Sequence, residues 1–453
     1  MTELRRVWAR LLLKFLSVLQ LLFAVIPAKA GIHSDLNTEE QMDSGFRRND
    51  ELKQAHSPTR LNLFLVCVAM LLSANTAAAP RVGVVTMEPG LEYWARFGHD
   101  AILIDDRADD PTSTPLLYNY GYFDFDQPGF LLHFAQGYMS YMLAAVPLDA
   151  DLAGYRQDGR GVTLQWLDLT PAQAQKLAQF LAWNARPEHA TYRYDYFTQD
   201  CSTKVRDALD AATDGLLRRQ LSSPSQGLTY RSEAVRLGAP LPWLGLSMHF
   251  ALGPFGDRPM SRWEEAFVPM RLRDALREVR TERGTPLVTS ESTLLPNRLA
   301  LPPAEAPNWR WRFLGLGIGL AALVLIGTRR ASRTTAALAG VFWLLCGLAG
   351  LGLAALWGLT EHRAIWGNEN LLLTNPLCLL LLPGALQLAR GRLPPRWHQS
   401  VLLLIALIAG VALFLKCLPF RIQGNGDWIA LFLPIHLTLA YAGRWTGSQS
   451  PVD

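Results

Sequence analysis

The stretch YDYFTQDCSTKVRD (residues 194–207) carries a cysteine into the start of a predicted helix. After the cysteine, apolar residues recur at helical spacing: Val205, Ala208, Leu209 and Ala212. This pattern predicts a helix that begins near Ser202, with Asp200 or Cys201 at its cap. Unpaired amide groups at a helix N-terminus favour a thiolate, so we predict a reactive thiol at Cys201. Lys204 and Arg206 would add positive charge nearby.

Cys201 is the one cysteine of the five that lies outside an apolar segment. Cys67 falls in an apolar targeting segment, and the other three lie in or beside runs long enough to enter a bilayer: Cys346, Cys378 and Cys417. A lone cysteine in an exported domain cannot form an internal disulfide. Two interpretations stay open: Cys201 packs as a small buried hydrophobe one turn before Val205, or it performs chemistry.

The composition predicts more than one domain and a membrane-embedded part. The chain has 453 residues, of which 50% are hydrophobic and 18% charged, and its last third is too apolar for a soluble protein. The net charge of +4 is small for this length, and no basic patch with interleaved aromatic residues occurs. We therefore expect no nucleic-acid partner.

Two apolar segments near the start have the pattern of a signal peptide, Leu11–Ile26 and Leu61–Ala74. The residues between them resemble a translated intergenic repeat of bacterial genomes. We predict that residues 1–59 are a mis-called start or a repeat-derived extension, and that residues 60–79 are the working signal peptide. The alternative is a genuine first membrane anchor.

A mixed, globular sequence follows at residues 80–294 and predicts one extracytoplasmic catalytic domain. A proline-rich linker is expected at residues 295–308. A five-helix transmembrane domain is predicted at residues 309–445, with a short cytoplasmic tail at 446–453. Five apolar runs support it: Trp311–Gly327, Thr335–Leu359, Leu371–Ala389, Ser400–Leu418 and Asp427–Gly443.

Arginines in the connecting loops predict the orientation of these helices. Arginine clusters follow the first and third runs, and one arginine follows the fifth: Arg329, Arg330, Arg333, Arg390, Arg392, Arg396 and Arg444. The other two loops carry only Arg363 and Arg421. Because cytoplasmic loops are enriched in Lys and Arg, the globular domain is expected outside and the C-terminus in the cytoplasm.

A nucleophilic thiol needs a base, and four histidines of the globular domain are candidates. His99 follows a glycine turn at the start of an apolar strand, so it could be held rigidly with one ring nitrogen free. We expect His133 to be a core histidine and give His189 and His249 structural roles. The strand predicted at residues 116–123 would pair with the His99 strand, so that Asn119 or Tyr120 could orient the imidazole.

The sequence contains no metal-binding motif and no phosphate-binding glycine loop, so we expect no metal and no cofactor. The external loop after the second apolar run is unusually polar, and an Asn-Pro pair falls inside the third run. Polar groups at membrane depth are costly and mark functional sites. We therefore predict lipid or substrate contacts at four residues: His362, Asn368, Asn370 and Asn375. The alternative is a solvated turn followed by a proline kink.

The chain resembles the family of bacterial membrane proteins with an Lnb-type N-terminal periplasmic domain. The resemblance rests on ordered motifs: Phe97-Gly98-His99, Tyr118-Asn119-Tyr120-Gly121-Tyr122-Phe123, Tyr192 to Phe197 running into Asp200-Cys201-Ser202-Thr203, Leu252-Gly253-Pro254 with Asp257-Arg258-Pro259 and Trp263-Glu264, and His362 with Asn368-Glu369-Asn370 and Asn375-Pro376. One position departs from the family pattern, because Asp200 stands where Asn usually precedes the cysteine. Its carboxylate would raise the pKa of the thiol.

The resemblance implies an α+β papain-like domain in permuted order, histidine before cysteine, as in lecithin-retinol acyltransferases. A five-helix transmembrane bundle in the bacterial inner membrane would follow. It also implies a thiol acyltransferase, with Cys201 as nucleophile and His99 as base. The enzyme would take an acyl chain from a phospholipid or lipoprotein donor and transfer it to a lipoprotein N-terminus.

Three alternatives to this function stay open. The same Cys/His pair could hydrolyse cell-wall peptides, although a cell-wall enzyme needs only one membrane anchor. With water as the acceptor, the enzyme would be a lipase or thioesterase. The domain could also be a sensor or binding module in which Cys201 only packs.

Overall fold

The computed structural model describes residues 79–123 and 129–443. The predicted N-terminal extension (1–59), all but the last residue of the predicted signal peptide (60–79) and the predicted tail (446–453) lie outside the described residues. The structure therefore bears on the globular domain, the linker and the apolar helices.

The globular domain is built on a seven-stranded sheet with the strand order β6-β4-β3-β2-β1-β5-β9. Every neighbouring pair is antiparallel. The predicted pairing of the His99 strand with the strand after it is confirmed, and Ala101 lies opposite Asn119. The strands are β1 (Arg81–Met87), β2 (His99–Asp105), β3 (Leu116–Tyr122), β4 (Ser140–Pro147), β5 (Val162–Leu167), β6 (Thr191–Arg193) and β9 (Val288–Leu295).

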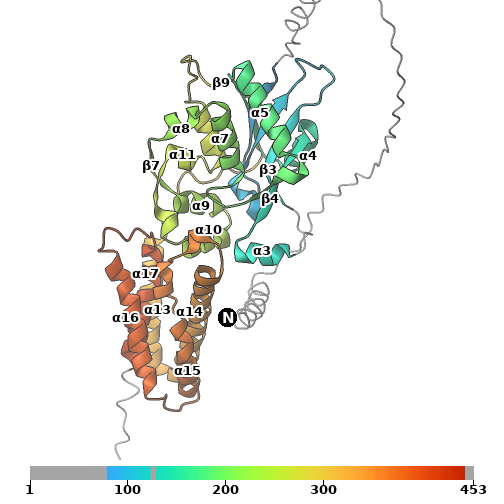
Figure 1. The fold of residues 1–453 in the computed structure, drawn as a ribbon. Helices are drawn as coiled ribbons and strands as arrows, with labels where there is room; N and C mark the ends of the chain where they lie inside the picture. Colours follow the sequence, from blue (N-terminus) through green and yellow to red (C-terminus); the bar gives the residue numbers. More distant parts are fainter. Residues whose placement is uncertain (1–78, 124–128, 444–453) are drawn as a thin grey trace, which may run out of the picture. The chain divides into compact units, whose positions relative to one another are not determined.

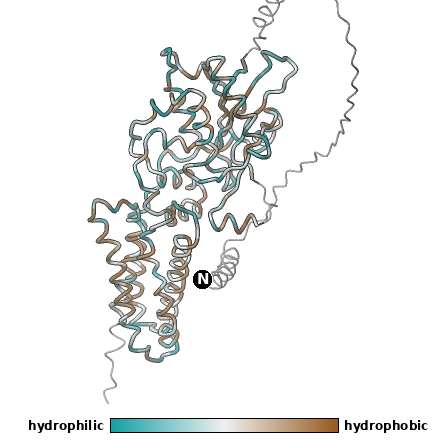
Figure 2. The backbone as a smooth tube through the Cα atoms, viewed as in Figure 1, coloured by the Kyte–Doolittle hydropathy of each residue, from teal (hydrophilic) through white to brown (hydrophobic). Residues whose placement is uncertain are grey.

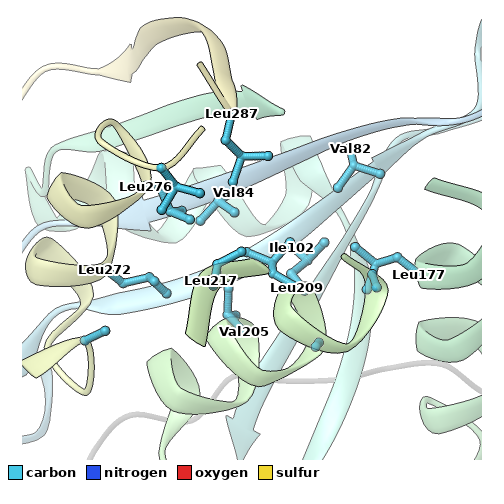
Figure 3. Close-up of a cluster of buried hydrophobic side chains, with 14 of the residues drawn as sticks. Val82, Val84, Ile102, Leu177, Val205, Leu209, Leu217, Leu272, Leu276 and Leu287 are labelled. Atoms are coloured by element: carbon cyan, nitrogen blue, oxygen red, sulfur yellow. The ribbon is translucent and has the colours of Figure 1, made fainter. Parts of the chain in front are cut away.

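Helices cover both faces of this sheet (Figure 1). Side chains alternate between the two faces of a strand. Val84 and Ile102 accordingly pack with Val205 of α7 (Figure 3), whereas Val85 belongs to a separate cluster with Leu152 of α4. The first face is covered by α5 (Pro171–Asn184), α7 (Cys201–Ala212), α8 (Leu216–Leu221) and α12 (Pro269–Leu276), and the second by α4 (Leu148–Asp158).

Shorter elements complete the domain. A two-stranded sheet pairs β7 (Pro224–Thr229) with β8 (Pro259–Ser261). The α-helices are α3 (Phe130–Gln136), α6 (Pro187–Ala190), α9 (Tyr230–Gly238), α10 (Pro242–Ala251) and α11 (Arg262–Glu265), and the 3₁₀ helices are η1 (Tyr93–Phe97) and η2 (Pro254–Asp257). Aromatic residues make a third cluster, in which Phe197 packs edge-on against Tyr230 at 5.1 Å between ring centroids.

The C-terminal region contains four helical segments long and apolar enough to cross a membrane, counted over the described residues. Figure 2 shows hydrophobic residues along the helices of this bundle and more hydrophilic residues in the turns. The segments are α13 (Arg310–Arg330), α14 (Ser332–Leu359), residues Glu369–Ala389 and α16 (Trp397–Leu415). The linker predicted at 295–308 connects the end of β9 to the start of α13.

The third segment is not one regular α-helix. It consists of η4 (Glu369–Leu372), η5 (Pro376–Leu381) and α15 (Leu382–Ala389). The break falls at Asn375, whose Oδ1 accepts a hydrogen bond from the Leu377 amide 2.9 Å away. Proline lacks an amide hydrogen, so Pro376 cannot continue a helix that precedes it.

The fifth predicted run corresponds to α17 (Gly426–Gly443), which packs against α13 and α16. Its Ile435 and Leu439 belong to the core of the bundle with Trp343 and Leu402. Its 18 residues include an internal proline, Pro434. It does not reach the apolarity of the other four segments, so the structure supports four spans by length and composition.

Candidate functional site

Cys201 is the first residue of α7, and Asp200 is the N-cap, as predicted. The cap is a reciprocal pair of hydrogen bonds. The Thr203 amide donates to Asp200 Oδ1 at 2.8 Å, and the Asp200 amide donates to Thr203 Oγ1 at 2.8 Å. Such a capping box satisfies two of the amides that a helix start leaves unpaired. The cap therefore fixes the backbone that carries the thiol.

A buried carboxyl group ties the start of α7 to strand β2. The residue after His99, Asp100, has no exposed surface, and its Oδ2 lies 2.7 Å from the hydroxyl of Ser202, the residue after Cys201. Thr86 of β1 donates to Asp100 Oδ1 at 2.6 Å. The Asp100 backbone also hydrogen-bonds the Cys201 side chain. The candidate base and nucleophile are thus carried by backbone segments in direct contact.

Asn119 orients the candidate base. His99 Nε2 lies 3.0 Å from Asn119 Oδ1, and Asn119 is almost fully buried. An amide oxygen only accepts, so Nε2 carries the hydrogen in this arrangement and Nδ1 keeps its lone pair. The alternative partner, Tyr120, instead donates its hydroxyl to Asn184 at 2.9 Å. His99 therefore has one ring nitrogen available to accept a proton.

Both members of the pair are neutral in the resting structure. Burial lowers the pKa of His99 to about 4. Burial also raises the pKa of the Cys201 thiol, and ionisation of Asp200 or Asp100 would raise it further. A proton must therefore leave the sulfur as the reaction begins, since no preformed thiolate–imidazolium pair is favoured.

The prediction of a favoured thiolate is wrong, because burial of the thiol outweighs the helix N-terminus and the charges of Lys204 and Arg206. The Lys204 ammonium lies 4.8 Å from the centre of the Tyr192 ring. Arg206 donates to Asp207 and to the Trp263 carbonyl. The effect expected for the carboxylate of Asp200, a raised thiol pKa, is confirmed in direction.

The structure adds Arg160, which sequence reasoning missed. Its charge lowers the pKa of His99, and Cys201 affects the pKa of Arg160 in turn, so the guanidinium lies within electrostatic range of both side chains. Arg160 is 7% exposed and is anchored by donation to the Glu88 carbonyl at 2.8 Å. A buried cation at this position would stabilise negative charge as it develops on sulfur. No local pattern indicated this role, because Arg160 follows α4 and approaches the site only through the fold.

Gly121 leaves space beside the thiol. Its φ of 105° is unfavourable for other residues, and a Cβ there would lie 3.8 Å from Cys201 Cβ. A side chain at this position would therefore point at the nucleophile.

The hydrogen bonds around the Ser202 hydroxyl indicate that Asp100 is protonated. Ser202 Oγ has one hydrogen but two oxygens within reach, Asp100 Oδ2 at 2.7 Å and the Ala266 carbonyl at 2.8 Å. If Asp100 is protonated, it donates to Ser202, and Ser202 donates to Ala266, so each contact has a hydrogen. Burial raises the pKa of Asp100 to about 7, which agrees with this arrangement. Burial also raises the pKa of Asp200 to about 8.

A cavity of about 470 Å³ lies between α5 and α7. Lys204, Ala208 and Ala211 line it from α7, and they continue the helical stripe that begins at Cys201. Tyr120 and Tyr192 line it from the sheet, and both pack in the same core region as Cys201. Binding sites for small ligands commonly have this volume.

The other three histidines of the globular domain make different contacts. The prediction of a core position for His133 is wrong, because this residue is exposed on the short helix α3. His189 stacks on Trp183 with ring centroids 4.1 Å apart. His249 is buried, with its Nε2 3.3 Å from Asp427 Oδ2. The last two therefore have contacts typical of structural histidines.

Two of the predicted lipid contacts are engaged within the protein. Asn370 has no exposed surface and donates to the Phe250 carbonyl at 2.8 Å. Asn368 donates to the carbonyls of Phe250 and Ala251 at 2.9 and 2.8 Å, and its Oδ1 accepts from Gln423. These amides fasten the external loop to the C-terminal end of α10. They are not available to a lipid in this arrangement.

The same loop holds a buried charge. Glu369 is 3% exposed and pairs with Lys416 and with Arg421. We call Asn368, Glu369, Asn370 and Gln423 the joint cluster, because they connect the globular domain to the external ends of the apolar helices.

The remaining two predicted lipid contacts differ in their surroundings. Asn375 caps η5, as described above, and is partly exposed. His362 lies 3.0 Å from the Phe134 carbonyl through Nε2 and stacks near Tyr196. His362 thus contacts the globular domain at α3. Within residues 79–123 and 129–443, no group of three or more His, Cys, Asp or Glu side chains could hold a metal ion.

Comparison with known sequences identifies both halves of the chain. The Lnb N-terminal periplasmic domain matches residues 72–234, which include His99, Asn119 and Cys201. The Lnb transmembrane domain matches residues 311–442. Comparisons with curated proteins and with solved structures gave no match. With a periplasmic domain and a transmembrane domain that are both of the Lnb type, the chain belongs to the Lnb family of membrane proteins.

Proposed function

We propose that the protein is a membrane-bound thiol acyltransferase whose site faces the periplasm. Cys201 is the nucleophile, His99 the general base and Asn119 the residue that orients the base. The observation that carries the proposal is the position of Cys201 at a capped helix start, hydrogen-bonded to the backbone of Asp100, whose neighbour His99 is held by Asn119. We further propose that the domain is papain-like in permuted order, and that α17 is a fifth membrane helix.

The first half of the proposed reaction makes a thioester. His99 Nδ1 takes the proton of the Cys201 thiol while sulfur attacks the carbonyl carbon of an acyl ester. Backbone amides at the start of α7 stabilise the resulting oxyanion, and Arg160 stabilises the charge on sulfur as it forms. The carbon–oxygen bond then breaks, and the imidazolium returns the proton to the departing alcohol. The donor is a phospholipid or a lipoprotein acyl ester.

The second half transfers the chain to an amine. The α-amino group of a lipoprotein attacks the thioester carbonyl, and His99 removes the proton from the nitrogen. The carbon–sulfur bond breaks, and Cys201 is restored as a thiol. The cavity beside α7 is a suitable place for part of the substrate, because it continues the helix stripe that carries the nucleophile.

The test is mass spectrometry of lipoprotein N-termini in a bacterial strain that lacks its own N-acyltransferase. Production of this protein is expected to add an acyl chain to those N-termini, and the Cys201→Ala variant is expected to add none. Cys417→Ala is a matched control, because Cys417 is an exposed thiol in the membrane part.

Each competing function predicts a different product. Release of free fatty acid without N-acylation would instead indicate a lipid hydrolase. New muropeptides would indicate a cell-wall hydrolase. Activity that Cys201→Ala retains would exclude all thiol mechanisms.

A further inference from the structure

Helix α3 exposes an unusual concentration of apolar side chains. Leu131 is 66% exposed, Leu132 37% and Phe134 40%, and Tyr138 just after the helix is 49% exposed. Phe130 is the residue that anchors the helix, because it is buried in a cluster with Met139 and Tyr141. A soluble surface helix usually turns such residues inward. Contiguous exposed apolar residues mark an interaction surface.

The backbone of α3 is hydrogen-bonded to the segment that follows α14. The Glu361 amide donates to the Gln136 carbonyl at 2.7 Å, and His362 Nε2 lies 3.0 Å from the Phe134 carbonyl. Leu359 is the last residue of α14, a candidate membrane span. Two residues of extended chain cover about 7 Å, so α3 lies close to the external end of that span.

A helix this close to the end of a membrane span lies at the depth of the lipid headgroups. Interfacial helices bury their apolar face about 5–10 Å into the boundary between headgroups and acyl chains. Nearby charge also suits a lipid surface. The guanidinium of Arg193 lies 5.1 Å from the centre of the Tyr138 ring and 3.6 Å from a Glu361 carboxylate oxygen, and its side chain is 49% exposed. Arginine at this level can bind lipid phosphate.

We propose that α3 is an interfacial helix, with Leu131, Leu132 and Phe134 inserted among the phospholipids of the outer leaflet beside α14. The occupant is the lipid of the membrane that the apolar helices span. This inference does not depend on the acyltransferase reaction, because it concerns only how the globular domain contacts the bilayer.

The inserted helix is connected to the candidate site by stacked aromatic rings. Phe130 stacks on Phe123 at 5.8 Å, Phe123 on Tyr141 at 4.9 Å, and Tyr141 on Tyr194 at 4.4 Å between centroids. Tyr194 lies in the segment that leads to Cys201. Lipid held at α3 would therefore lie at one end of a row of stacked aromatic rings that ends at Tyr194, seven residues before the nucleophile.

Photo-crosslinking of the full-length protein in phospholipid nanodiscs tests this inference. A photoreactive benzophenone amino acid is introduced at Leu131 or at Leu132, and at Trp183 of α5 as a control with similar exposure (45%) that does not line the cavity beside α7. Irradiation is expected to attach phospholipid at positions 131 and 132 and not at position 183. Crosslinks are identified by the mass of the lipid adduct.

Two results would overturn the inference: no lipid adduct at either α3 position, or adducts to a second protein copy in place of lipid. The label at Tyr138 gives an independent position outside the helix, should labelling within α3 disturb its packing. Cys201→Ala is expected to leave the lipid adducts unchanged, which separates this result from any failure of the proposed reaction.

Discussion

Two buried polar regions of this protein contrast in how their groups are bonded. In the joint cluster, the amides of Asn368 and Asn370 are paired with backbone carbonyls, and the charge of Glu369 faces two cations. Around Cys201, burial displaces the pKa values of acidic and basic groups instead, including those of Asp100 and His99. Paired polar groups hold domains together, whereas groups with displaced pKa values are candidates for proton transfer.

The largest effect on the acylation rate is expected for substitution of the general base, His99. His99→Ala should lower the acylation rate about 10²- to 10⁴-fold, the usual contribution of a general base. The thermal stability should change little compared with this loss. Single-turnover formation of the thioester, measured by quenched mass spectrometry, checks the prediction. A rate within a factor of about three of the wild type, well below that range, would remove His99 from the mechanism.

The joint cluster should show the opposite behaviour. Asn370→Ala removes a donor to the Phe250 carbonyl and an acceptor for Asn425. Leaving buried polar groups unpaired costs about 1–3 kcal/mol each, so the unfolding temperature in detergent should fall clearly. The acylation rate of the folded fraction should stay near the wild-type value. Asn297→Ala, at an exposed amide, is a matched control that should change neither quantity.

A smaller effect is expected for the orienting amide. Asn119→Ala removes one hydrogen bond to His99, worth about 1 kcal/mol, and should slow acylation about fivefold. Asn119→Asp keeps an acceptor for Nε2 but adds a charge. It is expected to raise the pKa of His99 and to move the acidic limb of the pH–rate profile upward. A profile identical to the wild type would show that this contact does not tune the base.

The last prediction concerns the proton on Asp100, whose effect is a change of stability with pH. Folding raises its pKa from 3.8 to about 7, so the folded state binds more protons between these values and loses stability as pH rises through that window. Asp100→Asn cannot titrate and should lack this loss. The charged neighbours Arg273, Glu88 and Asp200 are present in both proteins.

The measurement is the difference in unfolding temperature between Asp100→Asn and the wild type from pH 5 to pH 8 in detergent. Because the neighbouring groups are common to both proteins, this difference isolates the Asp100 carboxyl. The difference should grow with pH in favour of the variant. A constant difference would mean that Asp100 is already ionised at pH 5.

Local patterns were sufficient for the parts of the site that depend on one or two elements. Helical periodicity and the capping residue Asp200 placed Cys201 at a helix start. The pairing of two consecutive strands brought Asn119 to His99. These features depend on neighbours in the chain, which the sequence displays directly.

The electrostatics of the site could not be predicted in the same way. Lys204 lies one turn from Cys201 along the helix, yet its ammonium contacts the ring of Tyr192. Arg160 and Asp100 reach the thiol only because the sheet, α4 and α7 meet in space. The polar loop after α14 was noticeable in the sequence, but its amides bond to α10, more than a hundred residues earlier.

In the membrane part, too, some features could be predicted from local sequence and others depend on the fold. Run length and composition predicted the apolar helices, and the Asn375-Pro376 pair marked the irregular third segment. The fifth run, α17, contains Asp427, Pro434 and His436 and is not among the four segments that are long and apolar enough, so a fifth span stays a prediction. Its packing against α13 and α16 comes from the fold.

Trapping of an acyl group on Cys201 tests the central claim most directly. The full-length protein is incubated with phospholipid without an acceptor amine, and its peptides are analysed by mass spectrometry. We expect an acyl adduct on the peptide that contains Cys201, removed by hydroxylamine and absent in His99→Ala at short times. An unmodified Cys201 in a preparation that still acylates lipoproteins would contradict it.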